Sequence, residues 1–253
     1  MRRGIDYHIH TFYQKCGNET LTVEGIIRRA ETMRLSSIAI TDHLNHFDHI
    51  ENFRAIKRDL DAVDTDIEVF FGCELNYQGC DGEWAYSEAI RDDYGFQIAI
   101  GGIHSAYTDS TDKVEVIDIQ HRHHMRALED PLIDVLVHPY WFGKGDLDKR
   151  APEWWQDLME TFPAERITEL ADASRANNSG IEVNTAAVSH NAAYSDGFQM
   201  AYNVFVKSLA EAGALFTVGS DAHDINTIGF ADYGEGLLDG LGVWETQRWQ
   251  PAR

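Results

Sequence analysis

The chain has 253 residues, 43% of them hydrophobic and 11% aromatic, which is enough for a sizeable core in one large domain or two small ones. Its 42 acidic residues against 21 Lys and Arg give a formal net charge of −21, so we expect no long nucleic acid as a partner, because such binding depends on basic residues that neutralise phosphates. The sequence has no apolar run of about 18 residues and no secretory signal at its N-terminus, so we expect a cytoplasmic protein without a membrane partner.

Seven short apolar runs rich in β-branched residues alternate along the chain with segments of helical periodicity. The predicted strands are residues 5–9, 37–40, 67–71, 98–103, 133–137, 180–183 and 214–218. The predicted helices are residues 23–34, 50–63, 114–128, 167–177 and 200–212. Strands that alternate with helices of about 10–15 residues form βα units around a parallel sheet. We therefore predict an α/β fold, whose length suits one barrel domain over residues 1–253.

Three segments carry weaker signals. Residues 79–94 are compatible with a loop or a small helix. Residues 141–162 contain Gly, Pro and three Trp residues, and predict a long loop with one short helix over the mouth of the barrel. The tail after Gly240 has no strong periodicity, so no element is predicted there.

Every predicted strand ends in His, Asp or Glu. The polar strand-end residues, in chain order, are His8, His10, Asp42, His43, Glu74, His104, His138, Glu182, Asn184, Asp221 and His223. His8 and His10 are two residues apart, so in a strand they point to the same face. The carboxyl ends of barrel strands converge on one mouth, and imidazoles and carboxylates are common ligands of divalent metals. The sequence therefore predicts a metal site at this mouth.

The set of motifs resembles the polymerase-and-histidinol-phosphatase (PHP) family, in the family's order over nearly the whole chain. The matching residues are His8-x-His10, Thr41-Asp42-His43, Glu74, His104, His138 and Asp221-x-His223. Amidohydrolase barrels also carry an early His-x-His, but they typically rely on a metal-bridging Lys, and no Lys stands at a predicted strand end here. The resemblance implies a distorted seven-stranded (β/α)7 barrel that holds two to three divalent ions of Zn, Mn or Fe.

The resemblance also implies how the ligands are shared among the ions. One ion would be held by His8, His10, Glu74 and Asp221. A second would use Glu74 as a bridge, together with His104 and His138. A third would be held by His43, His223 and a residue in the loop after the first strand.

Cys16 occupies the position of that last ligand. Many relatives carry a His eight residues after the first His of His-x-His, and here the residue is Cys16. A thiolate binds Zn²⁺ or Fe²⁺ but matches Mn²⁺ and Mg²⁺ poorly. We favour Cys16 as a ligand; the alternatives are a weakened or lost third site and an ordinary loop cysteine. The chain's three cysteines are irregularly spaced, which does not predict a disulfide framework.

The chemistry implied is the hydrolysis of a phosphoric ester. Two or three divalent ions clamp a phosphoryl group and generate hydroxide, which would attack phosphorus in line without a protein nucleophile. Asp221 or His223 would deliver a proton to the leaving alkoxide. We expect Asp42 to orient a ligand or Thr41 from outside the metal shell.

Three further residues are candidates for binding substrate. Lys144 and Arg175 could neutralise the phosphate, although a surface Lys or Arg is usually only solvated. Asn184 could donate a hydrogen bond from the tip of a strand. We interpret the other histidines first as residues without a role at the site: His46 and His49 would cap or solvate the next helix, His121, His123 and His124 lie on a helical segment, and His190 lies in a polar loop. The alternatives are a second metal patch on the face that His121 and His124 share and a substrate contact of His190.

The leading hypothesis is a hydrolase that removes phosphate from a small phosphorylated metabolite, such as histidinol phosphate or a nucleotide. The alternatives are a phosphodiesterase or exonuclease that acts on small or cyclic nucleotides, and a non-catalytic metal-binding domain. The loops at residues 141–162 and 186–199 carry no readable specificity code, and the sequence leaves the oligomeric state open.

Overall fold

Seven parallel strands form one sheet in which each strand pairs with the next along the chain. The computed structural model describes residues 4–76, 84–141, 159, 162–189, 191–192 and 194–251. The strands are β1 (Gly4–Ile9), β2 (Leu35–Ile40), β3 (Glu68–Asn76), β4 (Ile98–Gly102), β5 (Val135–Leu136), β6 (Gly180–Asn184) and β7 (Phe216–Gly219). An isolated parallel bridge joins Ile9, at the end of β1, to Ala222, three residues after β7. The predicted α/β barrel is therefore confirmed, with a closure that is short and distorted.

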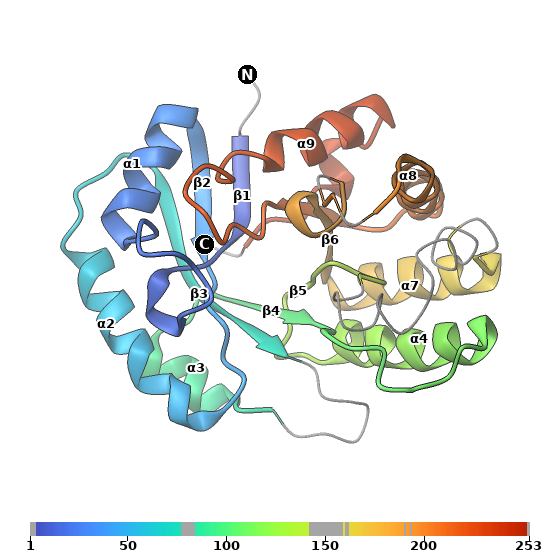
Figure 1. Cartoon of the computed structure of the whole chain (residues 1–253), viewed down its shortest axis with the longest axis horizontal. Helices are drawn as coiled ribbons and strands as arrows, with labels where there is room; N and C mark the ends of the chain where they lie inside the picture. Colours follow the sequence, from blue (N-terminus) through green and yellow to red (C-terminus); the bar gives the residue numbers. More distant parts are fainter. Residues whose placement is uncertain are drawn as a thin grey trace.

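Helices surround the strands, as Figure 1 shows. They are α1 (Val23–Met33), α2 (Ile50–Asp61), α3 (Glu88–Tyr94), α4 (Lys113–Glu129), α7 (Ala164–Asn177), α8 (Asp196–Glu211) and α9 (Ala231–Gly240). Short turns are η1 (Phe12–Gln14), η2 (Phe47–His49), the π-helical η3 (Thr185–Ser189) and η4 (Glu245–Gln247). In the described part of the chain, no helix combines the length and the apolar character needed to cross a membrane.

Local signals explain where several helices begin. The side chains of Thr22, Ser87, Asp112 and Ser195 accept hydrogen bonds from backbone N–H groups in the first turns of α1, α3, α4 and α8. Such N-caps satisfy amides that have no partner within the helix. Helix α3 forms the last part of the segment at residues 79–94, for which a loop or a small helix is expected; residues 79–83 lie outside the described residues.

Helix α9 was not predicted, because its glycines weaken the helical signal. Gly234 lies against β7, where an added Cβ would come within 2.9 Å of Val218 Cγ1, so close packing favours Gly there. The tail after Gly240, for which no element is predicted, contains the short turn η4 and packs against the barrel. Trp249 is buried at the foot of the barrel, where its backbone N–H donates to Phe216 O at 2.8 Å and its Nε1 donates to Asn178 O at 2.8 Å.

Phe53 packs the outer core between α2, β3 and the loop before β4. Its ring is fully buried, 6.2 Å from the Phe71 ring and 5.1 Å from the Phe96 ring. Phe53→Ala should lower the free energy of unfolding by about 3–5 kcal/mol, measured by urea denaturation. The control is Phe47→Ala, because Phe47 is 61% exposed and its loss should change stability by about 0.5 kcal/mol or less. Equal effects of the two variants would contradict this packing.

Candidate metal centre

Two imidazoles project together from the carboxyl end of β1. His8 and His10 are both buried, and their Nε2 atoms lie 3.1 Å apart. The alternation of side chains in a strand puts both on one face, while Ile9 between them packs into the apolar core. At most one hydrogen can lie between the two nitrogens, so at least one of them points a lone pair into this space, and a cation that displaced the hydrogen would meet both lone pairs.

The carboxylate of Glu74 lies among five imidazoles. Its Oε1 is 3.0 Å from His104 Nε2 and 3.1 Å from His138 Nε2. Its Oε2 is 2.8 Å from His43 Nδ1 and 3.4 Å from the Nε2 atom of each β1 histidine. Because each oxygen meets a different set of ring nitrogens, Glu74 is placed to bridge two ions.

The surroundings of Glu74 fit divalent cations. Its carboxylate is buried, and the basic groups that it meets within 4 Å, among the residues described, are histidines. Glu74 Oε2 and His43 Nδ1 lie 2.8 Å apart but are not in hydrogen-bond geometry, so neither buried atom has a hydrogen-bond partner. Burial acts to raise the pKa of Glu74, but the positive charges of His43, His8 and His104 outweigh it and hold that pKa well below its usual range. A buried carboxylate that depends on nearby positive charge is a suitable metal ligand.

Three groups of ligand atoms are compact enough to share an ion, with all atoms of a group within 4.8 Å of one another. The groups are His8, His10 and Glu74; His43, Glu74 and His104; and His10, Cys16, His43 and His223. The first two share Glu74. The third contains the residues that the family pattern assigned to a third ion, with His10 in addition.

Cys16 lies in the loop after η1, with its side chain partly buried. Burial and the nearby carboxylate of Asp42 raise the pKa of the Cys16 thiol to about 12. Since the thiolate is the ligand, an ion that binds Cys16 has to displace its proton.

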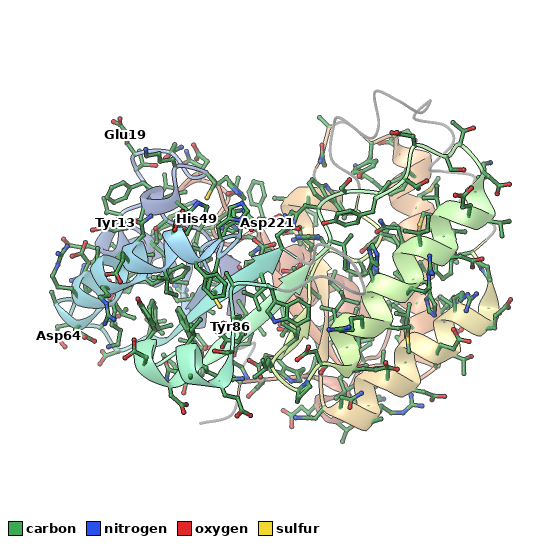
Figure 2. The ribbon with its side chains drawn as sticks, turned by 90° about the horizontal axis from the view of Figure 1, so that it is seen from below. Tyr13, Glu19, His49, Asp64, Tyr86 and Asp221 are labelled. Carbon is green, nitrogen blue, oxygen red and sulfur yellow. The ribbon has the colours of Figure 1, made fainter. Side chains whose placement is uncertain are left out.

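Asp221 and His223 follow β7 and complete the rim. Asp221 Oδ1 is 3.1 Å from His10 Nε2 and 3.5 Å from His8 Nε2. His223 Nδ1 lies 3.0 Å from the backbone oxygen of Asp221. The backbone φ angles of Asp221 and His138 are positive, at 53° and 33°, a conformation that residues other than Gly rarely adopt. Figure 2 places Asp221 near the middle of the molecule, whereas Asp64 and Glu19 lie at its periphery.

A cavity of about 500 Å³ opens onto these ligands. His43, His104, His138, Asp221 and His223 line it on the metal side, and the remaining walls include Trp141, Ala186, Ala187, Asp224 and Thr227. The Trp141 ring lies 5.2 Å from that of His138. None of the described residues that line the cavity is Lys or Arg.

Comparison with known proteins agrees with this geometry. The model of the PHP domain family matches residues 6–186. The chain belongs to the PHP domain family. It is 24% identical over 245 residues to a probable phosphatase of Tolumonas auensis, which covers 94% of this chain and 86% of the relative. It is also 24% identical over 249 residues to a probable phosphatase of Shewanella sp. strain ANA-3, which covers 95% of this chain and 84% of the relative.

A solved structure shares the fold of this PHP-family chain. It is the crystal structure of a candidate histidinol phosphatase from Listeria monocytogenes, with a TM-score of 0.57 and 13% sequence identity. The alignment covers 89% of this chain and 97% of the other. The resemblance to the PHP family that the motifs indicated is thus confirmed at the level of family and fold.

Arg175 does not reach the mouth of the PHP barrel. It lies in the last turn of α7, next to the amino end of β6, at the opposite end of the strands from the metal ligands. Its guanidinium pairs with Asp172 and donates to the backbone oxygen of Ala212. This placement corrects the expectation that Arg175 binds the phosphate, because α7 returns the chain to the foot of the barrel. Lys144 lies outside the described residues.

Asn184 and Asp42 have hydrogen-bond partners within the protein. Asn184 is buried, and its Nδ2 donates to Glu182 Oε2 at 2.9 Å and to Asp221 Oδ2 at 3.5 Å; its contact with substrate stays a prediction. Asp42 accepts from the backbone N–H and the hydroxyl of Thr11, at 3.0 and 2.7 Å. The partner of Asp42 is therefore Thr11 and not the expected Thr41.

Two residues that orient ligands were given no role from the sequence. Asn76 Oδ1 lies 3.0 Å from His104 Nδ1, and Glu182 Oε1 lies 2.9 Å from His8 Nδ1. Asn76 stands two residues after Glu74 in the same strand, so alternation could have placed it on the same face. The pairing of Glu182 with His8 depends on the register of the whole barrel.

Gly102 lies where the β4 backbone passes closest to the ligands. An added Cβ would come within 2.7 Å of His138 Cε1 and 2.9 Å of Glu74 Oε1. Any larger residue would displace the His138 imidazole or the Glu74 carboxylate, so the close approach requires Gly at this position.

Proposed function

We propose that this chain is a metal-dependent phosphoesterase that hydrolyses a small phosphate monoester. The observation that carries the proposal is Glu74, whose two oxygens meet two sets of imidazoles on one side of a 500 Å³ cavity. Divalent ions bound there would polarise phosphoryl oxygens and lower the pKa of a water molecule. The chain's own residues then have to position those ions, admit the ester and supply a proton to the leaving group.

Asp221 and His223, in the segment that follows β7, are the candidates for the proton donor. The His223 side chain is 41% exposed and that of Asp221 is 15% exposed, so His223 is the more accessible to an ester in the cavity. We assign the proton to His223 where its ring is free of metal. If His223 instead holds the third ion, the proton has to come from a water molecule, because an imidazole bound to metal has no proton to give from that nitrogen. Asp221 does not replace it: burial acts to raise the pKa of Asp221, but the positive charges of His8 and His10 hold that pKa well below its usual range and leave the carboxylate ionised.

The cavity favours a small leaving group without further phosphates. Trp141, Ala186 and Ala187 offer an apolar wall to its carbon skeleton. Asp224 adds negative charge, and the described lining residues offer no Lys or Arg to a second anionic group. Histidinol phosphate and nucleoside monophosphates are the first substrates to test, the former because the Listeria monocytogenes neighbour is described as a candidate histidinol phosphatase.

A panel of esters tests this function. The protein, loaded with Zn²⁺, Mn²⁺ or Fe²⁺, is assayed with histidinol phosphate, nucleoside monophosphates, cyclic dinucleotides and single-stranded DNA. We expect kcat/KM for at least one monoester to exceed that for every diester by roughly 100-fold, and chelation of the metal to abolish turnover. Preference for a diester would support the phosphodiesterase alternative. Inactivity on all of them, with metal bound, would support a non-catalytic metal-binding domain.

A further inference from the structure

Glu182 is a buried carboxylate of β6 that neither lines the cavity nor belongs to a proposed metal ligand set. Its Oε1 lies 2.9 Å from His8 Nδ1. Its Oε2 accepts from the backbone N–H of His138 at 2.9 Å and from Asn184 Nδ2 at 2.9 Å. The side chain is 1% exposed, and its two oxygens form polar contacts with these three nitrogens. One carboxylate thus joins residues that lie on β1, after β5 and on β6.

The contact with His8 selects which ring nitrogen faces the metal centre. A carboxylate oxygen only accepts hydrogen bonds, so His8 Nδ1 carries the hydrogen that lies between the two groups. The lone pair of neutral His8 is then on Nε2. That atom lies 3.1 Å from His10 Nε2 and 3.4 Å from Glu74 Oε2, on the side where an ion would bind. A carboxylate on the distal nitrogen of a ligating His fixes both its tautomer and its ring orientation.

The contact with His138 supports a strained backbone. His138 has φ of 33°, a conformation that costs energy in any residue other than Gly. The N–H of this residue is buried, and Glu182 Oε2 satisfies it. The bend directs His138 Nε2 to within 3.1 Å of Glu74 Oε1, the oxygen that also meets His104.

The neighbouring strand leaves room for this carboxylate. A Cβ added to Gly219 of β7 would lie 2.0 Å from Glu182 Oε1 and 2.5 Å from the Cβ of His8. Real Cβ contacts are not that short, so only Gly at position 219 allows Glu182 to reach His8.

We propose that Glu182 is a positioning residue that orients His8, which faces Glu74 Oε2, and His138, which faces Glu74 Oε1, and so couples the two sides of the metal centre. It acts through these histidines and contacts no substrate. The inference rests on the metal centre of the proposed function, but it holds whichever ester that centre hydrolyses.

Glu182→Gln is the sharpest variant because an amide has one acceptor where the carboxylate has two. The Oε2 position receives two donors, from His138 and Asn184, so the amide oxygen is expected to take it. The amide NH₂ would then face His8 Nδ1 and force it to accept. The ring hydrogen of His8 would move to Nε2, which removes the lone pair from the metal side.

The experiment measures zinc binding and histidine tautomers, without an activity assay. Chelator-stripped wild type and Glu182→Gln are titrated with Zn²⁺ against a competing chelator, and ¹⁵N-histidine spectra are recorded on the zinc-loaded proteins. We expect roughly 10–100-fold weaker binding of at least one ion, with His8 Nε2 no longer zinc-bound in the spectrum. The matched control is Glu235→Gln, because Glu235 is a largely buried carboxylate that pairs with Arg248 at 3.0 Å, far from the ligands. Its zinc affinity should equal that of the wild type.

Unchanged zinc affinity and an unchanged His8 signal in Glu182→Gln would overturn the proposal. If that variant does not fold, judged by circular dichroism, Glu182→Asp replaces it, since Asp keeps the charge but is too short to reach both histidines. Wild-type zinc affinity in Glu182→Asp would likewise overturn it. A wild-type protein that binds no zinc would instead refute the metal centre of the proposed function, so the two failures are distinguishable.

Discussion

Glu74→Gln should reduce kcat/KM for the phosphate monoester by on the order of 10³-fold or more, which corresponds to about 4 kcal/mol of transition-state stabilisation. Glu74 is the group that meets both ligand sets, through Oε1 toward His104 and His138 and through Oε2 toward His43. An amide keeps one weaker oxygen ligand and presents an NH₂ group to the other set, which repels a cation. Steady-state kinetics and elemental analysis of the purified variant measure the effect.

The control for that variant lies at the other end of the same strand. Glu68 is exposed at the start of β3, and Glu68→Gln should keep full metal content and full turnover. If the Glu74→Gln variant retained full metal content and full turnover, this carboxylate would not bridge ions, and the assignment of the cluster would be wrong.

Cys16→Ser should lower the metal content by about one ion per chain, from three to two if all three sites are filled. Cys16 shares a compact group with His10, His43 and His223, and a hydroxyl is a far poorer ligand for Zn²⁺ or Fe²⁺ than a thiolate. Cys16→His should restore the third ion, because imidazole also suits these metals. Elemental analysis after loading and gel filtration measures the stoichiometry.

Cys73 provides the matched control for Cys16. It is the other free cysteine of the described residues, and it is buried in the core beside Leu75 and Ala99. Cys73→Ala should therefore lower stability and leave the number of bound ions unchanged. Loss of no ion in Cys16→Ser would mean that Cys16 is an ordinary loop cysteine and that the third site does not depend on it.

The fold and the proposed ligands could be predicted from two features of the sequence, which are its hydrophobic periodicity and the residue types at the strand ends. The period of two in β1 placed His8 and His10 on one face, and the alternation of strands and helices implied that all carboxyl ends share one mouth. The structure brings all nine proposed ligands to that mouth. These features follow from the local sequence and the parallel topology, so they do not require atomic detail.

The remaining features depend on register and packing. Glu182 lies 174 residues from His8 in the chain, so their hydrogen bond could be found only once the strands were aligned. The hydrogen bond from Thr11 to Asp42 joins the segments after β1 and β2, so it too could not be predicted before the strands were aligned. Arg175 is a different case: a helix that precedes a strand delivers its last turn to the foot of the barrel, and the topology alone was sufficient to exclude it from the mouth.

Anomalous diffraction from crystals of the zinc-loaded protein tests the central claim most directly. We predict at least two anomalous peaks among the strand-end histidines, with Glu74 bound to both ions through different oxygens, and a third peak beside Cys16. Loaded crystals with no peak in this cluster, or with a single ion that does not contact Glu74, would contradict the account.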